Sequence, residues 1–207
     1  MPPDARDAAF TERLDDAFFA RDALVVARAL LGTLLVHRPA EGDARALRIV
    51  ETEAYRGPKD LACHARAGLT KRTRTLYGPP GRAYVFLIYG MYECFNVVCF
   101  GEGKGHAVLV RAGEPVSGIP ASQRTDGPGR MSRALGITRA HDGVDLREGR
   151  LFLAPAPRLS GARPRVTITA RVGVAYAGLY AEKPWRFLDA TSAHVSRPGP
   201  RQIGAGA

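Results

Sequence analysis

The strongest constraint on the fold of this sequence is the way its β-type segments follow one another. Aromatic and β-branched residues are concentrated in residues 45–55, 84–89, 93–100 and 106–112, and glycine-containing turns separate the last three of these segments. Strands joined by short turns pair as antiparallel hairpins, whereas parallel strands need a long crossover connection. The sequence therefore predicts an α+β protein built on a mainly antiparallel sheet.

The predicted helices are short and lie outside these hairpins. Asp22 is placed to cap a helix that ends at Gly32, and short helices are also expected over residues 10–19 and 131–135. Further strands are expected over residues 33–37, 151–154 and 166–171. We expect a single compact domain with a curved sheet, surrounding helices and a protruding β-hairpin that turns at Gly90.

No internal repeat or linker divides the 207 residues. The first 20 residues are charged and irregular, and the last 11 are rich in Gly and Pro. We therefore expect a flexible N-terminal arm over residues 1–20, a folded domain over residues 21–196 and a disordered tail over residues 197–207.

Composition narrows the class of protein. The 30 Lys and Arg against 20 Asp and Glu give a formal net charge of +10, which favours a polyanionic partner such as nucleic acid, although an Arg-rich composition is an alternative explanation. Three cysteines are too few for a disulfide scaffold. The longest apolar stretch, residues 23–36, contains Arg28 and is too short to cross a bilayer. We expect a cytoplasmic protein that does not enter a membrane.

Two glutamates stand out on one predicted strand. Glu51, Glu53 and Tyr55 occupy every second position along it, so their side chains share one face. Carboxylates at i and i+2 lie roughly 7 Å apart, and their repulsion raises the pKa of one of them, which suits a general base. A solvated strand face is the alternative explanation. The spacing does not rank Glu51 against Glu53.

Large apolar residues occupy the tip of the strongest predicted hairpin. Tyr89, Met91 and Tyr92 would be exposed there, which is costly unless something covers them. Aromatic side chains near basic residues suit insertion between stacked bases, and a buried tip is the alternative. His64 follows Cys63, but neighbouring side chains point apart and make a poor metal site. His64 either contacts a substrate or is an ordinary loop histidine.

Together these segments resemble the alkyladenine (3-methylpurine) DNA glycosylase family. The matching residues span about residues 20–190 in family order, and an ordered set of this kind is specific where a single block is weak. They are residues 29–32, residues 49–55, Gly57, Pro58, Asp60, His64, residues 84–91, residues 96–98, residues 108–112, Glu114, Pro115, residues 127–129, residues 171–174 and residues 183–187.

The resemblance implies a monofunctional DNA glycosylase over residues 21–196. Such an enzyme flips an alkylated purine, of the 3-methyladenine type and with hypoxanthine as a further candidate, out of double-stranded DNA. It then hydrolyses the N-glycosidic bond with a Glu-activated water. The implied enzyme needs no cofactor and no metal, and we expect a monomer, associated with the nucleoid if the source is bacterial.

The resemblance also implies a role for particular residues. Phe86 stands where the family usually has Tyr, which removes a hydroxyl group, and Thr73 stands where Asn is usual. The implied catalytic residues are Glu53 and Arg111, the base-pocket residues are Tyr55, His64, Phe86 and Asn96, the intercalating residue is Tyr89, and the other DNA-binding residues are Met91, Tyr92, Arg72 and Arg74.

Two alternative functions use the same residues. A non-catalytic basic nucleic-acid-binding module would bind DNA with a steep salt dependence and release no base. A metal-dependent hydrolase would place His64 and Glu51 or Glu53 on a metal ion and lose its activity in a chelator, but the spacing of these residues is poor for metal binding.

Overall fold

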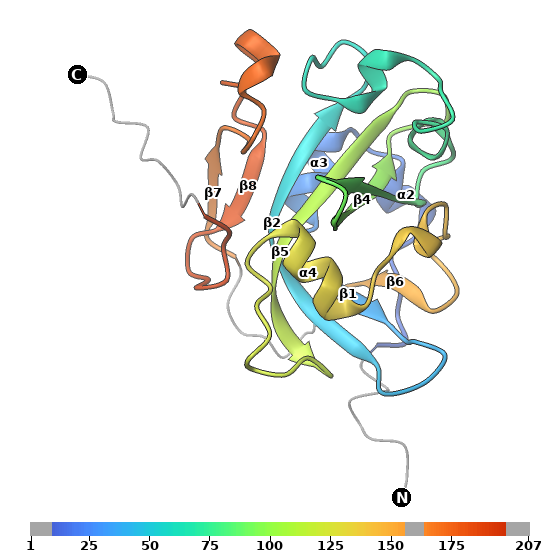
Figure 1. Ribbon diagram of the computed structural model, residues 1–207, viewed down its shortest axis with the longest axis vertical. Coiled ribbons are helices and arrows are strands. Elements are labelled where there is room, and N and C mark those ends of the chain that lie inside the picture. Colours follow the sequence, from blue (N-terminus) through green and yellow to red (C-terminus); the bar gives the residue numbers. More distant parts are fainter. Residues whose placement is uncertain (1–9, 156–163, 198–207) are drawn as a thin grey trace, which may run out of the picture.

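The computed structural model describes residues 10–155 and 164–197. Within this part of the chain, eight strands form one sheet in the order β3-β4-β5-β2-β1-β6, with β8 paired to β2 and β7 paired to β8 (Figure 1). The described pairs are all antiparallel. The predicted α+β class, with its curled antiparallel sheet in a single domain, is confirmed.

The strands are β1 (Leu34–His37), β2 (Arg45–Arg56), β3 (Ala83–Ile88), β4 (Tyr92–Cys99), β5 (His106–Ser117), β6 (Leu151–Ala154), β7 (Val166–Thr169) and β8 (Arg186–Asp189). The α-helices are α2 (Asp16–Phe19), α3 (Ala23–Ala29) and α4 (Pro128–Leu135), and the 3-10 helices are η1 (His64–Ala67), η2 (Thr75–Tyr77), η3 (Arg139–His141) and η4 (Ala175–Tyr180). No helix in residues 10–155 or 164–197 is both long and apolar enough to span a membrane.

Strand β2 organises the sheet because it has neighbours on both edges along most of its length. One edge pairs with β5, while the other pairs first with β1 and then with β8. The register of the β2–β5 pair shifts between Ile49 and Thr52, near the change of neighbour. Such irregularities increase local twist and redirect side chains. They allow β2 to leave β1 and take up β8.

The two faces of β2 have different surroundings. Ala54 is buried in the main apolar core, and the Thr52 hydroxyl donates to the Ala27 carbonyl of helix α3 at 2.8 Å. Helix α3 begins as predicted, since the Asp22 carboxylate accepts from the Leu24 amide at 2.9 Å. Because side chains alternate, the glutamates of β2 point away from this core.

The N-terminal region differs from its prediction. The helix expected over residues 10–19 is only the four-residue α2. Phe10 and Leu14 are buried, and the Leu14 amide donates to the Leu153 carbonyl at 3.0 Å. The chain therefore packs on the domain from residue 10 onward, although a flexible arm was expected up to residue 20. Residues 1–9 of that arm and residues 198–207 of the expected tail lie outside the described residues.

We expect that only glycine fits well at position 113, because Gly113 pairs with Ile49 at the irregular part of β2. A Cβ at this position would fall on the Leu47 side chain and 2.9 Å from the Arg48 carbonyl oxygen. We expect Gly113→Ala to lower the free energy of unfolding by about 1–3 kcal/mol. Urea denaturation measures this, with Gly101→Ala as control because its Cβ would meet only the flexible Lys104 side chain at 3.4 Å. Equal stability of the two variants would contradict the prediction.

Candidate active site

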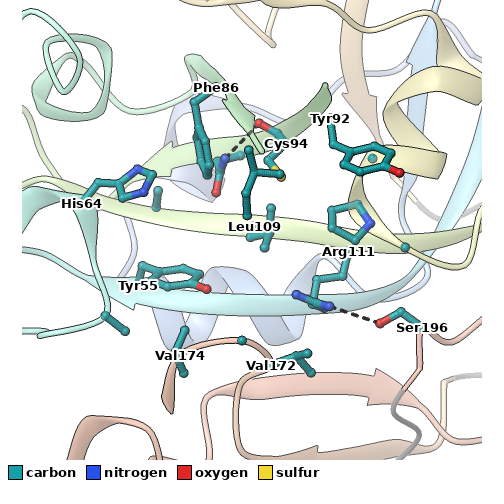
Figure 2. Close-up of a pocket in the computed structure, with 18 of the residues that line it drawn as sticks. Tyr55, His64, Phe86, Tyr92, Cys94, Leu109, Arg111, Val172, Val174 and Ser196 are labelled. Atoms are coloured by element: carbon teal, nitrogen blue, oxygen red, sulfur yellow. Dashed lines mark hydrogen bonds between the residues drawn. The ribbon is translucent and has the colours of Figure 1, made fainter. Parts of the chain in front are cut away.

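A cavity of about 740 Å³ opens beside the β3–β4 hairpin. Its walls come from β2, β3, β4, β5, the start of α4 and the segments that follow β7 and β8. Figure 2 shows side chains from these separate elements converging on one space. The predicted site residues that line it are Tyr55, His64, Phe86, Tyr89, Tyr92, Asn96 and Arg111.

Aromatic rings form two opposite sides of this cavity. Tyr55 lies on one side, and His64 and Phe86 lie on the other (Figure 2). The His64 and Phe86 ring centres are 4.5 Å apart, and His64 Nδ1 is 3.0 Å from the Tyr84 hydroxyl oxygen. The arrangement suits a flat aromatic ligand placed between the two sides.

His64 is held in its neutral form. Burial, with the Arg72 charge as a second cause, lowers the pKa of the His64 imidazole to about 4. At neutral pH the ring therefore carries no charge that would repel a cationic ligand. Asn96 is also held in place, because its amide nitrogen donates to the carbonyls of Tyr84 at 3.0 Å and Cys94 at 3.2 Å.

Both glutamates of β2 are fully buried, each with 0% of its surface exposed. The alternative of a solvated strand face is therefore wrong. Arg111, on the neighbouring strand β5, lies between the two carboxylates: its Nε is 3.1 Å from Glu51 Oε1 and its Nη1 is 3.4 Å from Glu53 Oε1. Burial opposes the charge of Arg111, but Glu53 and Glu51 outweigh burial and raise its pKa.

Each oxygen of the Glu53 carboxylate accepts a hydrogen bond. The Val172 amide donates to Oε1 at 2.7 Å, and the Tyr55 hydroxyl donates to Oε2 at 2.9 Å. Burial and the adjacent Glu53 charge raise the pKa of Tyr55 well above its usual value, so the phenol stays a donor. Glu53 lies behind Tyr55, Arg111 and Val172, which line the cavity.

A buried ion pair that sequence reasoning missed supports Tyr55 from behind. The Arg171 guanidinium lies 4.7 Å from the centre of the Tyr55 ring and binds both oxygens of Asp60, at 2.6 and 2.9 Å. Although Asp60 and Arg171 are both in family-like segments, nothing in their separation of 111 residues predicts this contact. The only available signal was Arg171, a charged residue within the otherwise apolar residues 170–174.

The hairpin tip is exposed, so the alternative of a buried tip is wrong. Tyr89 has 83% of its surface exposed, and Met91 and Tyr92 are exposed beside it. Tyr89 and Gly90 both adopt positive φ, of 52° and 69°, and this is unusual for a tyrosine. Tyr92 packs closely on Gly129, where a Cβ would fall 2.7 Å from a Tyr92 ring carbon.

Arg72 and Arg74 lie on an exposed loop and do not line the main cavity. The Arg72 guanidinium is 5.9 Å from the centre of the Phe86 ring. Between them, the buried Thr73 donates its hydroxyl to the Gly68 carbonyl at 2.7 Å and so fixes the loop. In the part of the chain that the structure describes, no three His, Cys, Asp or Glu side chains gather where they could hold a metal ion.

Comparison with known proteins confirms the family resemblance. The model of the family described as methylpurine-DNA glycosylase (MPG) matches residues 17–193. A protein of Myxococcus xanthus (strain DK1622) is 54% identical over 187 residues, which cover 90% of this chain and 95% of that protein. A protein of Methanocella arvoryzae is 46% identical over 198 residues, which cover 90% of this chain and 96% of that protein.

A third relative, from Anaeromyxobacter dehalogenans (strain 2CP-C), is 54% identical over 189 residues, which cover 91% of this chain and 88% of that protein. All three relatives bear the name "Putative 3-methyladenine DNA glycosylase". The family match covers the sheet, the aromatic cavity and the buried carboxylates. The chain therefore belongs to the methylpurine-DNA glycosylase family and is an enzyme of the DNA glycosylase class.

Proposed function

We propose that this protein is a 3-methyladenine DNA glycosylase that removes alkylated purines from double-stranded DNA and so begins base excision repair. The observation that carries the proposal is the Glu53 carboxylate, which Tyr55, Arg111 and Val172 hold directly behind an aromatic-walled cavity. Family membership and the names of the relatives support the lesion class. A module that only bound DNA would have no need to bury these carboxylates, which is costly.

Glu53 is the proposed general base. An alkylated purine is cationic and a good leaving group, and the sugar becomes oxocarbenium-like as the N-glycosidic bond breaks. A carboxylate beside the sugar stabilises that positive charge and takes a proton from the attacking water, whose oxygen bonds to C1′. Arg111 would help to hold this water. The purine then leaves with the electron pair of the broken bond.

Tyr55 and Phe86 are the proposed stacking partners of the flipped base. A cationic purine between aromatic rings gains roughly 0.5–2 kcal/mol of cation–π attraction. Neutral His64 adds no opposing charge on the same side. Phe86 retains the stacking face of the usual Tyr but lacks its hydroxyl. Asn96, which is fixed by two backbone carbonyls, would face the edge of the purine.

Tyr89 is the proposed intercalating residue. Flipping a nucleotide costs a few kcal/mol, and a side chain that fills the space left in the duplex offsets part of this cost. Met91 and Tyr92 would contact the flanking bases, and Arg72 and Arg74 would contact phosphates. We propose that the protein acts as a monomer on DNA in the cytoplasm, and hypoxanthine remains a further candidate substrate.

Replacement of the proposed base should greatly slow excision. We expect Glu53→Gln to lower the single-turnover rate of 3-methyladenine release by about 10²–10⁴-fold, the usual contribution of a general base. Chromatography of bases released from methylated DNA measures the rate. The control is Glu102→Gln, which makes the same change at an exposed position. Equal release by the two variants would remove Glu53 from this role.

Replacement of the strained tyrosine at the hairpin tip should increase folding stability and reduce base flipping. Asn tolerates positive φ better than Tyr, so Tyr89→Asn is expected to raise the free energy of unfolding by up to about 1 kcal/mol. The same variant should populate the flipped state less, as read by a fluorescent base analogue, while binding to undamaged DNA changes little. Unaltered flipping would contradict the intercalating role.

His64 should make stability depend on pH. Its folded pKa of about 4 lies below the usual 6.5, so the unfolded chain takes up the proton more readily. Folding stability should therefore fall as pH drops from about 6.5 towards 4. Urea midpoints at pH 7 and pH 5 test this against His64→Gln, which should lose less stability over the same interval. A larger loss in the variant would contradict the assignment.

A further inference from the structure

We propose that Ser196 and Glu51 are positioning residues that hold the Arg111 guanidinium in its working orientation, so that Ser196, which follows β8, is part of the active site. This inference rests on the proposed function, because it assigns how a residue of that site is oriented. Ser196 lies 145 positions after Glu51 in the sequence, yet the two side chains are in direct contact.

Ser196 is tied to the site through its backbone as well as its side chain. Its amide donates to Glu51 Oε2 at 2.6 Å, and its hydroxyl donates to Glu51 Oε1 at 2.8 Å. Its carbonyl accepts from Arg186 Nη2 at 3.2 Å. Only 2% of the Ser196 surface is exposed. The residue is therefore held by charged side chains where the chain runs past the cavity.

The Ser196 hydroxyl also accepts from Arg111. Arg111 Nη2 donates to it at 3.4 Å, the contact drawn at the right of Figure 2. The hydroxyl thus receives a hydrogen bond from Arg111 while it gives one to Glu51. Since a hydroxyl has one donor and two acceptor sites, it can make both bonds at once. An alanine at this position could make neither.

Each nitrogen of the Arg111 guanidinium faces a different partner. Nε faces Glu51, Nη1 faces Glu53 and Nη2 faces Ser196. The guanidinium is planar and rigid, so three contacts in different directions fix its rotation. The Arg111–Glu53 contact, at 3.4 Å, is longer than the Arg111–Glu51 contact. Its direction therefore depends on the contacts of Arg111 with Glu51 and Ser196.

Glu51 is paired with two guanidiniums and takes no part in the proposed reaction. Glu51 accepts from Arg111 at 3.1 Å and from Arg186 at 2.6 Å, in addition to Ser196. Two carboxylates and two guanidiniums thus form one buried cluster. Neither Glu51 nor Glu53 lines the cavity, but Glu51, unlike Glu53, accepts hydrogen bonds from two guanidiniums as well as from the Ser196 amide and hydroxyl. Its position beneath Arg111 suits a residue that acts through Arg111 and never touches the substrate.

The test is a double-mutant cycle between Ser196 and Arg111. Single-turnover release of 3-methyladenine from methylated DNA is measured for the wild type, Ser196→Ala, Arg111→Lys and the double variant. We expect Ser196→Ala to slow release about tenfold in the wild-type background and less than twofold in the Arg111→Lys background. Affinity for undamaged DNA should change less than twofold. The control is Ser192→Ala, which lies in the same segment away from the cavity and should match the wild type.

A direct measurement of Arg111 covers the case in which Arg111→Lys releases too little base to measure. The Nε–H signal of Arg111 in NMR should persist at neutral pH in the wild type and in Ser192→Ala. It should exchange faster with water in Ser196→Ala and in Glu51→Gln, which keeps the shape of Glu51.

An unchanged release rate in Ser196→Ala, equal losses in the two backgrounds or an unchanged Arg111 signal would overturn the inference. If the wild type itself releases no base, the proposed function fails and the inference fails with it. If the wild type releases base and any of these three results is found, the inference fails alone.

Discussion

The interaction on which the rest of the site depends is the burial of two carboxylates on one strand around the guanidinium of Arg111. Removing a charge from water costs several kcal/mol unless partners and hydrogen bonds compensate it. Glu51 and Glu53 are both fully buried, so this part of β2 folds only if β5 brings Arg111 and β8 brings Arg186 to the same place. The proposed catalytic arrangement and the folding of the sheet centre therefore share one electrostatic requirement.

The sheet meets this requirement through the change of neighbour along β2. Strand β1 covers only the first part of β2, and β8 pairs with Glu51, Thr52 and Glu53. That pairing brings Arg186, which is opposite Glu53, and the following segment to the carboxylate face. The other face, through Thr52, remains on helix α3. The bulged strand thus separates an apolar core on one side from a charged site on the other.

Period-2 alternation predicted that Glu51, Glu53 and Tyr55 share a face, and turn residues predicted the β3–β4 hairpin, because both are local properties of the backbone. The sequence left an exposed and a buried hairpin tip as alternatives. The proposed role of Glu53 came from the family resemblance and not from spacing. The contacts of Ser196 with Glu51 and of Arg171 with Asp60 could not be predicted, since each joins residues more than 100 positions apart. Strand β8 was not predicted, because Arg186 and Asp189, which are buried in the structure, make its sequence resemble a polar segment.

The cavity combines two kinds of environment that select for the same lesion in the proposed reaction. Its aromatic sides favour a flat cation by their π faces, and the carboxylate behind Tyr55 favours the positive charge that develops on the sugar. A normal purine is neutral and a poor leaving group, so it gains little from either. Selection of an alkylated purine over a normal one would then depend on charge more than on shape, whereas hypoxanthine, which is neutral, would not gain from this effect. This is consistent with a neutral His64, since a protonated imidazole in the same wall would oppose both effects.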